Sequence, residues 1–373
     1  MAEIKSRKQL PLCESFLLDT TNITMVLVSA LHKKEYKIRL RNKIGAAIVA
    51  FMVIFCLYGV AQSASSALDK LIEAAKKEGK ILTYGDYTAD EAIEIQGAFS
   101  KRYPFLKFEH LSMGGSDVTN RVLLESKSGT PGADVAITGG PTFLPLAREG
   151  FLRQVDWASL GAQSSAIDTA WGVTVATVTY VLARNTKLVT QADAPKNWND
   201  LLNPKWKGSI GIWVNPLPFA DLVPVWGENQ VTDYLKKLMQ NDPVIIRGGA
   251  EIPSRLAAGE VSVAVLIDQT IRQVVRSGGP IEWVWPDPIP MTRIDAAIPK
   301  LARNPNAAML YALWLSSPEG AAVYEKATWR GNVFVPTAPI AQKTKGKKFS
   351  FWPTDKAEGR AAAVKRFTPI ITP

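Results

Sequence analysis

A long apolar stretch near the middle of the chain constrains the fold more than any other segment. From Val173 to Leu182, both alternating sets of residues are apolar, aromatic or threonine, so an extended strand here could be buried on both faces. About fourteen extended residues at roughly 3.3 Å each would reach some 46 Å, well beyond a usual strand of about five or six residues. Residues 171–214 therefore predict either two strands with a kink or one strand that leaves one lobe and enters another. The rest of the sequence favours the second arrangement.

Length and composition predict a globular protein with two lobes. The chain has 373 residues, of which 47% are hydrophobic, and this is enough to form two lobes of ordinary size. Its formal charge of +10 does not indicate a nucleic-acid partner, because residues 1–63 carry nine Lys/Arg against four Asp/Glu. The remaining charge is mild for a chain of this length and shows no basic face with interleaved aromatic residues.

Residues 1–63 read as an N-terminal extension and a signal peptide. A basic n-region spans 37–43, an uncharged apolar run spans 44–60, and small residues suited to cleavage follow. We expect a cleaved secretory signal and hence a periplasmic protein. An uncleaved anchor is the alternative, since the apolar run lies at the lower edge of what spans a bilayer. Residues 1–36 are unusual before a signal, so either Met25 is the true start or the n-region is long.

The chain after residue 63 alternates strands with helices. Strands predicted at 80–84, 107–113 and 133–138 each lead into a polar loop and a helix, and Thr88 opens the first of these helices with a capping box. Such units predict a mainly parallel, doubly wound α/β sheet with helices on both faces.

The same pattern begins again after the long strand. We expect strands at 208–214, 261–267 and 281–285, a return crossing at 293–298, and a loosely structured segment over the last thirty or so residues. Two lobes follow from this repetition. We assign 64–178 and 296–373 to lobe 1 and 179–295 to lobe 2, joined by crossing hinge strands.

Ligands of open α/β sheets lie beyond the carboxyl ends of the strands. The candidate ligand-binding residues are those that the pattern places at these edges: Tyr84, Asp86, Tyr87, Gly114, Gly115, Ser116, Gly139, Gly140, Trp213, Asn215, Gly249, Asp268, Gln269, Thr270, Arg272 and Arg293.

Several of these residues leave two roles open. Arg272 and Arg293 could hold a carboxylate or phosphate with forked hydrogen bonds, or form ion pairs within the protein. Trp213 could stack on a ligand ring or fill the core. Asp86 and Asp268 could pair with an amine or cap neighbouring helices. The helix expected after Gly114 offers free N–H groups to an anion, although the same glycines suit an ordinary turn.

Several ordered blocks of the sequence resemble periplasmic solute-binding proteins of ABC importers, in the ferric-iron-type group of the type II fold. The blocks include "PGADVAITGGP", "APKNWNDLLNPKWKGSIGI", "RLAAGEVSVAVLID" and "NPNAAMLYALWLSSPEGAAVYEKA". The resemblance covers nearly all of residues 67–340. It implies a two-lobed clamp that captures a small solute in its cleft and delivers it to an ABC permease in the inner membrane. We expect a monomer without cofactor, metal, catalysis or nucleic-acid partner.

The resemblance does not extend to iron ligands. Iron-binding members place two adjacent tyrosines where this chain has Thr270 and Ile271, and neither residue can ligate iron as phenolate does. His110, the single histidine after residue 63, is expected to be packed rather than metal-bound. Our preferred solute is therefore a small organic anion, such as a carboxylate or phosphonate. A ferric-iron or polyamine-type binding protein, or a ligand sensor for a membrane receptor, stays as an alternative.

An exported enzyme is disfavoured by the residues themselves. Both cysteines, Cys13 and Cys56, precede residue 64, and no nucleophile motif surrounds His110. The sequence also has no H-E-x-x-H zinc helix and no P-loop.

Overall fold

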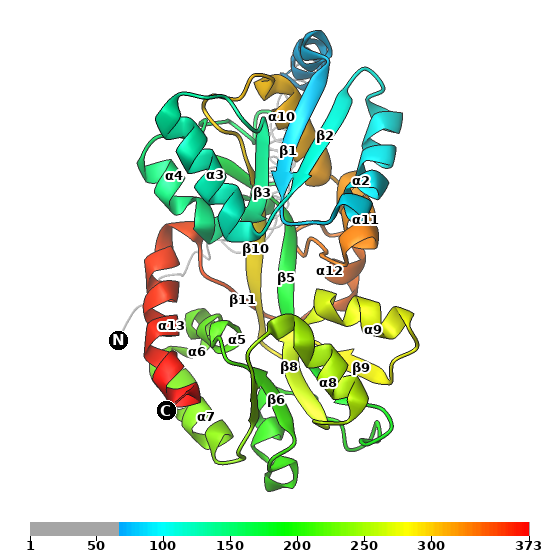
Figure 1. Cartoon of the computed structure of the whole chain (residues 1–373), viewed down its shortest axis with the longest axis vertical. Coiled ribbons are helices and arrows are strands. Elements are labelled where there is room, and N and C mark those ends of the chain that lie inside the picture. The colour runs from blue at the N-terminus through cyan, green and yellow to red at the C-terminus, as the bar shows by residue number, and fades with distance from the viewer. Residues whose placement is uncertain (1–66, 373) are drawn as a thin grey trace, which may run out of the picture. The chain divides into compact units, whose positions relative to one another are not determined.

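A computed structural model describes residues 67–372, so the predicted extension and signal region, residues 1–63, lies outside the described residues. Residues 64–373 form one compact unit, and within it two lobes are joined by two long strands, β5 and β10 (Figure 1). No helix within 67–372 combines the length and apolar character needed to cross a bilayer.

The strand β5, Gly172–Asn185, confirms the predicted crossing between lobes. Its first part pairs antiparallel with β10, Ile289–Ala297, which is the predicted return strand and begins four residues earlier than expected. Its last part pairs antiparallel with β8, Val263–Ile267, and along its other edge with β9, Ile281–Val284. One continuous strand is therefore hydrogen-bonded into the sheets of both lobes.

The first lobe is built on three parallel strands followed by the antiparallel β10. The strands are β1 Lys80–Gly85, β2 Lys107–Ser112 and β3 Val135–Gly139, in the order β2-β1-β3-β10-β5. The short strand β4, Ile167–Thr169, pairs with the start of β5.

Helices cover both faces of this sheet. The helix over 67–78 and three further helices share one buried cluster: α2 Ala89–Arg102, α10 Pro305–Leu315 and α11 Pro318–Thr328. The opposite face packs on α3 Gly115–Ser128, on the 3₁₀ turn Gly140–Phe143 and on α4 Leu144–Arg148.

Local signals set the helix ends as predicted. Thr88 and Glu91 form the expected capping box of α2, and the Ser317 hydroxyl accepts the Gly320 N–H at the start of α11. The end of α3 was not predicted: the helix runs to Ser128, and Gly129 after it has a φ of +69°, which suits glycine.

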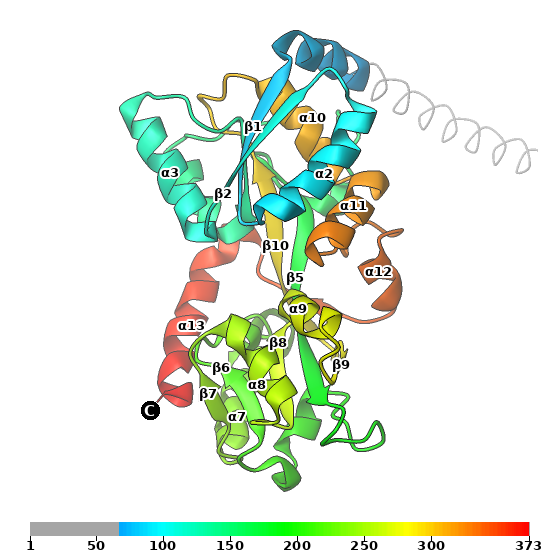
Figure 2. The same ribbon diagram turned by 45° about the vertical axis from the view of Figure 1, so that its right-hand side comes forward.

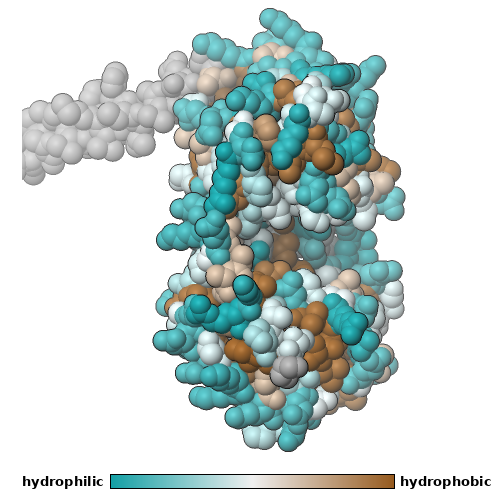
Figure 3. Space-filling view, turned by 60° about the vertical axis from the view of Figure 1, so that its left-hand side comes forward, coloured by the Kyte–Doolittle hydropathy of each residue, from teal (hydrophilic) through white to brown (hydrophobic). Residues whose placement is uncertain are grey.

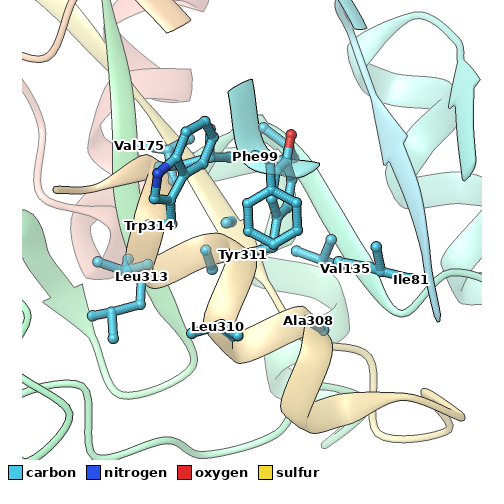
Figure 4. Close-up of a cluster of buried hydrophobic side chains, with 14 of the residues drawn as sticks. Ile81, Phe99, Val135, Val175, Ala308, Leu310, Tyr311, Leu313 and Trp314 are labelled. Atoms are coloured by element: carbon cyan, nitrogen blue, oxygen red, sulfur yellow. The ribbon is translucent and has the colours of Figure 1, made fainter. Parts of the chain in front are cut away.

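The core of the first lobe is centred on α10, which is apolar on all sides and buried along almost its whole length. Its Tyr311 meets Phe99 of α2 edge to face, with ring centroids 4.8 Å apart, and Trp314 packs on both rings (Figure 4). The cluster holds α2 and α10 against the same face of the sheet.

The second lobe continues the sheet from β5 in the order β5-β8-β6-β7. The remaining strands are β6 Ile210–Trp213 and β7 Val244–Ile246, both parallel to each other and to β8. Its helices are α5 Leu217–Ala220, α6 Val223–Trp226, α7 Glu228–Met239, α8 Ile252–Ala258 and α9 Arg272–Arg276. Short 3₁₀ turns span Ser164–Ala166, Trp198–Leu202, Pro204–Trp206, Gly249–Glu251 and Asp268–Ile271.

The prediction of a loosely structured C-terminal segment was wrong. This segment contains α12 Pro339–Lys343, β11 Phe349–Ser350, the 3₁₀ turn Thr354–Lys356 and the fifteen-residue helix α13 Ala357–Ile371. The lysines before α13 obscured an apolar stripe of Ala363, Phe367 and Ile371, which is buried in the same cluster as α7. The helix α13 therefore packs in the second lobe and not, as predicted for 296–373, in lobe 1. The other lobe boundaries stay a prediction.

A buried ion pair fixes α13 in place. Arg360 donates from Nε and Nη2 to the two carboxylate oxygens of Asp221, at 2.7 and 2.6 Å, and from Nη2 to the Thr292 hydroxyl at 2.6 Å. Asp221 is completely buried, and burial raises the pKa of its carboxyl although the guanidinium opposes this.

We predict that Arg360→Leu lowers the free energy of unfolding by about 3 kcal/mol, because it leaves the Asp221 carboxylate buried without a partner. The control is Arg366→Ala on the same helix, which breaks an exposed ion pair with Glu228 and should cost at most about 1 kcal/mol. Urea unfolding of a chain that begins at residue 64 measures both. Equal losses in the two variants would contradict this account of α13.

Candidate functional site

Three loops meet at Arg330, which lies two residues after α11. One follows α11, one follows β1 of the first lobe, and one follows β8 of the second lobe. Its Nη1 donates to Asp86 Oδ1 at 2.5 Å and its Nη2 to the Asp86 carbonyl at 3.2 Å, in the loop after β1. Its Nε donates to Gln269 Oε1 at 2.7 Å, in the turn after β8. We call these three residues the Arg330 bridge. It joins Asp86 of the first lobe to Gln269 of the second. The surface of the molecule narrows between the two lobes (Figure 3).

Arg272 makes a second contact between the lobes. Its Nη1 lies 3.0 Å from Glu91 Oε1 of α2 and also donates to the carbonyl of Ala327 at the end of α11. Of the two roles that the sequence left open, the structure therefore places Arg272 in an ion pair within the protein.

Arg293 of β10 is likewise engaged and only 5% exposed. Its Nε donates to the Thr174 hydroxyl at 2.7 Å and its Nη2 to the Ser165 carbonyl at 3.2 Å. The guanidinium lies over the ring of Phe334, 4.2 Å from its centroid. This arginine is part of the buried polar core between β5 and β10.

The first-lobe edge brings the three predicted loops together. A Cβ on Gly115 would lie 2.7 Å from the Thr138 hydroxyl and 3.6 Å from Asp86 Oδ2, so the backbone approaches closely here. The helix α3 begins without a side-chain cap, and within residues 67–372 the amides of Gly115 and Ser116 have no hydrogen-bond partner. Ser116 is exposed, so these amides are available to a solute.

Two other first-lobe glycines differ from each other. The carbonyl of Gly139 accepts the hydroxyl of exposed Thr142 at 2.7 Å, at the start of the turn after β3. Gly140 is buried, and a Cβ there would lie 2.2 Å from Asp295 Oδ2. It serves close packing against β10 and is turned away from the loop edge.

The second-lobe edge contributes aromatic and cationic groups. The half-buried Trp213 donates from Nε1 to the Arg247 carbonyl at 3.1 Å, and its ring covers Gly249. Asn215 and Thr270 are used locally: the Asn215 amide oxygen accepts the Leu217 N–H, and the Thr270 hydroxyl donates to the Ile267 carbonyl. The exposed guanidinium of Arg247, after β7, has no ion-pair partner in the described part of the chain.

Neither candidate tyrosine offers a phenolate. Tyr84 donates to Glu125 Oε1 at 2.9 Å. The Tyr87 hydroxyl is buried 3.4 Å from those of Thr83 and Tyr311, and burial raises the pKa of Tyr87 to about 12. His110 stacks on Tyr87, with ring centroids 4.2 Å apart, and is therefore packed, as expected.

Residues 67–372 contain no group of three or more His, Cys, Asp or Glu side chains that could hold a metal ion.

Asp268 is a buried carboxyl at the end of β8. Its Oδ2 accepts the Thr179 hydroxyl at 2.5 Å and its Oδ1 accepts the Gln269 N–H at 2.8 Å. The same threonine oxygen accepts the Trp285 indole N–H at 3.0 Å. Desolvation raises the pKa of Asp268 to about 7, although these hydrogen bonds oppose the change.

The predicted site residues thus separate into three groups. Asp86, Gly115 and Gln269 lie at or beside the Arg330 bridge, whereas Tyr84, Tyr87, Gly140 and Arg293 serve buried packing. Asp268 and Arg272 are engaged within the protein. The others lie along the two loop edges, and their role toward a solute stays a prediction. The sequence reasoning missed Arg330 and Arg247, since no motif surrounds either residue; only their positions next to the end of a helix or strand could have indicated them.

A family model for bacterial extracellular solute-binding proteins matches residues 95–353. Among curated proteins, an uncharacterized protein of Haemophilus influenzae is 32% identical over 138 residues. That match covers 34% of this chain and 39% of the relative, so the chain spans well under half of the relative's length.

Solved structures share the two-lobed fold. Iron-bound HitA from Pseudomonas aeruginosa is 20% identical, with a TM-score of 0.61 over 78% of this chain and 99% of that one. Trichodesmium FutA, solved with iron and citrate, is 18% identical, with a TM-score of 0.65 and coverage of 78% and 99%. AfuA from Actinobacillus pleuropneumoniae, solved with fructose-6-phosphate, is 21% identical, with a TM-score of 0.61 and coverage of 79% and 99%. These likenesses confirm the predicted fold class, and the family model confirms the resemblance to solute-binding proteins.

We predict that Asp268 makes stability fall as the pH rises. Between about pH 4 and 7 the unfolded chain ionises this carboxyl while the folded chain keeps it protonated, so the folded state binds more protons and loses stability with rising pH. Asp268→Asn keeps the neutral shape and removes this loss. From pH 5 to 7 the variant should therefore gain about 2 to 3 kcal/mol relative to the wild type.

Urea unfolding at several pH values measures this gain. Asp233→Asn, at an exposed position of α7, controls for the removal of a negative charge. If the curves of the wild type and Asp268→Asn run parallel, Asp268 does not titrate as described.

Proposed function

Because the chain belongs to the bacterial extracellular solute-binding proteins, we propose that it is the exported receptor of an ABC importer. In this proposal the chain captures a small organic anion, such as a carboxylate or phosphonate, between its lobes and delivers it to a permease in the inner membrane. The observation that carries the proposal is the meeting of loops from both lobes at the Arg330 bridge.

The bridge supports a clamp because its contacts depend on both lobes. Arg330 is held by Asp86 of the first lobe and by Gln269 of the second. A solute bound beside it would add contacts from both sides only in the closed state, and so would shift the equilibrium toward closure. The strands β5 and β10 connect the lobes, and the chain crosses between them again from α11 to α13, so such a movement would bend all three crossings.

An anion is favoured by the groups that have no protein partner. The guanidinium groups of Arg330 and Arg272 are already paired with the carboxylates of Asp86 and Glu91. What is left for a solute is the uncapped start of α3, with the exposed Ser116 beside it, and the guanidinium of Arg247 at the opposite loop edge. Both features attract negative charge.

The side chains of the candidate site also argue against ferric iron. The phenols of Tyr84 and Tyr87 are engaged within the protein, and Thr270 and Ile271 stand where iron-binding relatives would need tyrosines. A polyamine solute would need free carboxylates at the edge, but Asp86 is already paired with Arg330. A sensor that presents the closed clamp to a membrane receptor uses the same solute contacts.

Calorimetry of the mature chain against carboxylates, phosphonates, amines and ferric citrate tests this proposal. We expect at least one anion to bind, and small-angle scattering to show a smaller radius of gyration in its presence. Arg247→Gln should weaken the binding of that anion about tenfold, which corresponds to about 1.4 kcal/mol. Arg276→Gln, at an exposed position of α9, should leave it unchanged. Binding of amines or ferric citrate without any anion would refute the proposed solute class.

A further inference from the structure

A cavity of about 280 Å³ lies where α11 and α12 of one side face β9 and the end of β8 on the other. Figures 1 and 2 both place α11 and α12 directly above α9 and β9. Its walls include the indoles of Trp283, Trp285 and Trp329, and the carboxyls of Asp268 and Glu325 also line it. We call this cavity the tryptophan pocket.

We propose that the tryptophan pocket is a second ligand site and that it takes an alkylated ammonium group. The proposal goes beyond the anion capture described above. It shares no residue with the start of α3 or with Arg247, so either site can exist without the other.

The indoles provide the faces that an alkylated cation needs. The ring of Trp283 lies 6.4 Å from that of Trp285 at an interplanar angle of 72°, and 6.4 Å from that of Trp329 at 31°. Faces set at different angles can surround a cation on several sides, and tryptophan gives the strongest cation–π attraction of the aromatic residues. An alkylated ammonium ion also buries its methyl groups against these apolar walls.

The backbone holds one of these indoles at a conformational cost. Trp329 ends α11 with φ at +62°, in the left-handed region where bulky residues are uncommon and glycine is usual. Its ring lies 6.4 Å from that of Trp283 of the second lobe. A strained aromatic residue at an interlobe cavity supports a functional interpretation rather than simple packing.

The acidic side chains of the tryptophan pocket are more deeply buried than its basic side chains. Asp268 is 6% exposed and Glu325 is half-buried, whereas Lys326 and Lys343 are exposed. The two carboxyls thus lie inside the pocket and the two ammonium groups at its rim. Burial raises the pKa of both carboxyls, that of Asp268 to about 7, so a bound cation would favour their ionised forms. The buried indole N–H of Trp283 has no hydrogen-bond partner within residues 67–372, so one wall of the pocket holds an unsatisfied donor.

Binding of choline, compared with its neutral isostere 3,3-dimethyl-1-butanol, tests the proposal by calorimetry and tryptophan fluorescence. The two probes have the same shape, so a cation site should bind choline at least tenfold more tightly. Equal binding of the two probes, or binding of neither, would overturn the proposal.

Substitutions locate the binding. Trp283→Leu should weaken choline binding at least tenfold, while Trp226→Leu, a half-buried indole of the same lobe outside the pocket, should not change it. Lys343→Gln removes a rim cation and should strengthen choline binding about two- to fivefold, a gain that misfolding cannot produce. Unchanged choline binding in both Trp283→Leu and Lys343→Gln would place the cation elsewhere and refute the site.

The same variants separate this proposal from the proposed function. Trp283→Leu should retain the affinity of wild type for the organic anion, since none of the anion groups lies in the tryptophan pocket. Loss of choline binding with retained anion binding supports two sites. Parallel loss of both ligands would refute a separate site.

Discussion

The hydrogen bonding of β5 to strands of both lobes is the constraint on which the rest of the structure depends. A strand edge in a buried sheet must satisfy its amides and carbonyls, and β5 does so with β10 along its first part and with β8 and β9 along its last part. The two lobes therefore cannot separate without breaking a sheet. They can only bend about the segment where β5 passes from one set of partners to the next, and this leaves the loop edges free to approach each other.

The charges at the lobe junction follow the general cost of burying ions. Arginine and carboxylate groups taken from water need a partner, and Arg272, Arg293 and Arg330 each have a carboxylate within 4 Å. Such pairing fixes how the two lobes meet, but it adds little net free energy to their association, because it mainly offsets the cost of desolvating the charges. It also means that arginines counted from a sequence overstate the positive charge that a solute would meet.

The sequence predicted those features that depend on neighbours along the chain. The capping box at Thr88 and the alternating pattern of β5 each act within a few residues, so the fold and several element ends could be derived. The end of α3 at Gly129 was not among them. The role of Arg293 could not, because its partners Thr174 and Ser165 are more than a hundred residues away. The helix α13 was missed for a related reason: its apolar stripe is short and follows a lysine-rich stretch, and only contact with α7 shows what it packs against.

The attachment of α13 has a practical consequence for measuring movement. The helix over 67–78 is packed into the first lobe, whereas α13 is anchored to the second through Asp221 and Phe367. The first turn of α13 also pairs with the first lobe, through Glu358 and Arg148 of α4. A donor dye on the helix over 67–78 and an acceptor dye at an exposed position near the C-terminal end of α13 would therefore each report on a different lobe. Single-molecule energy transfer between them would then follow the bending of β5 directly, without any label near a ligand.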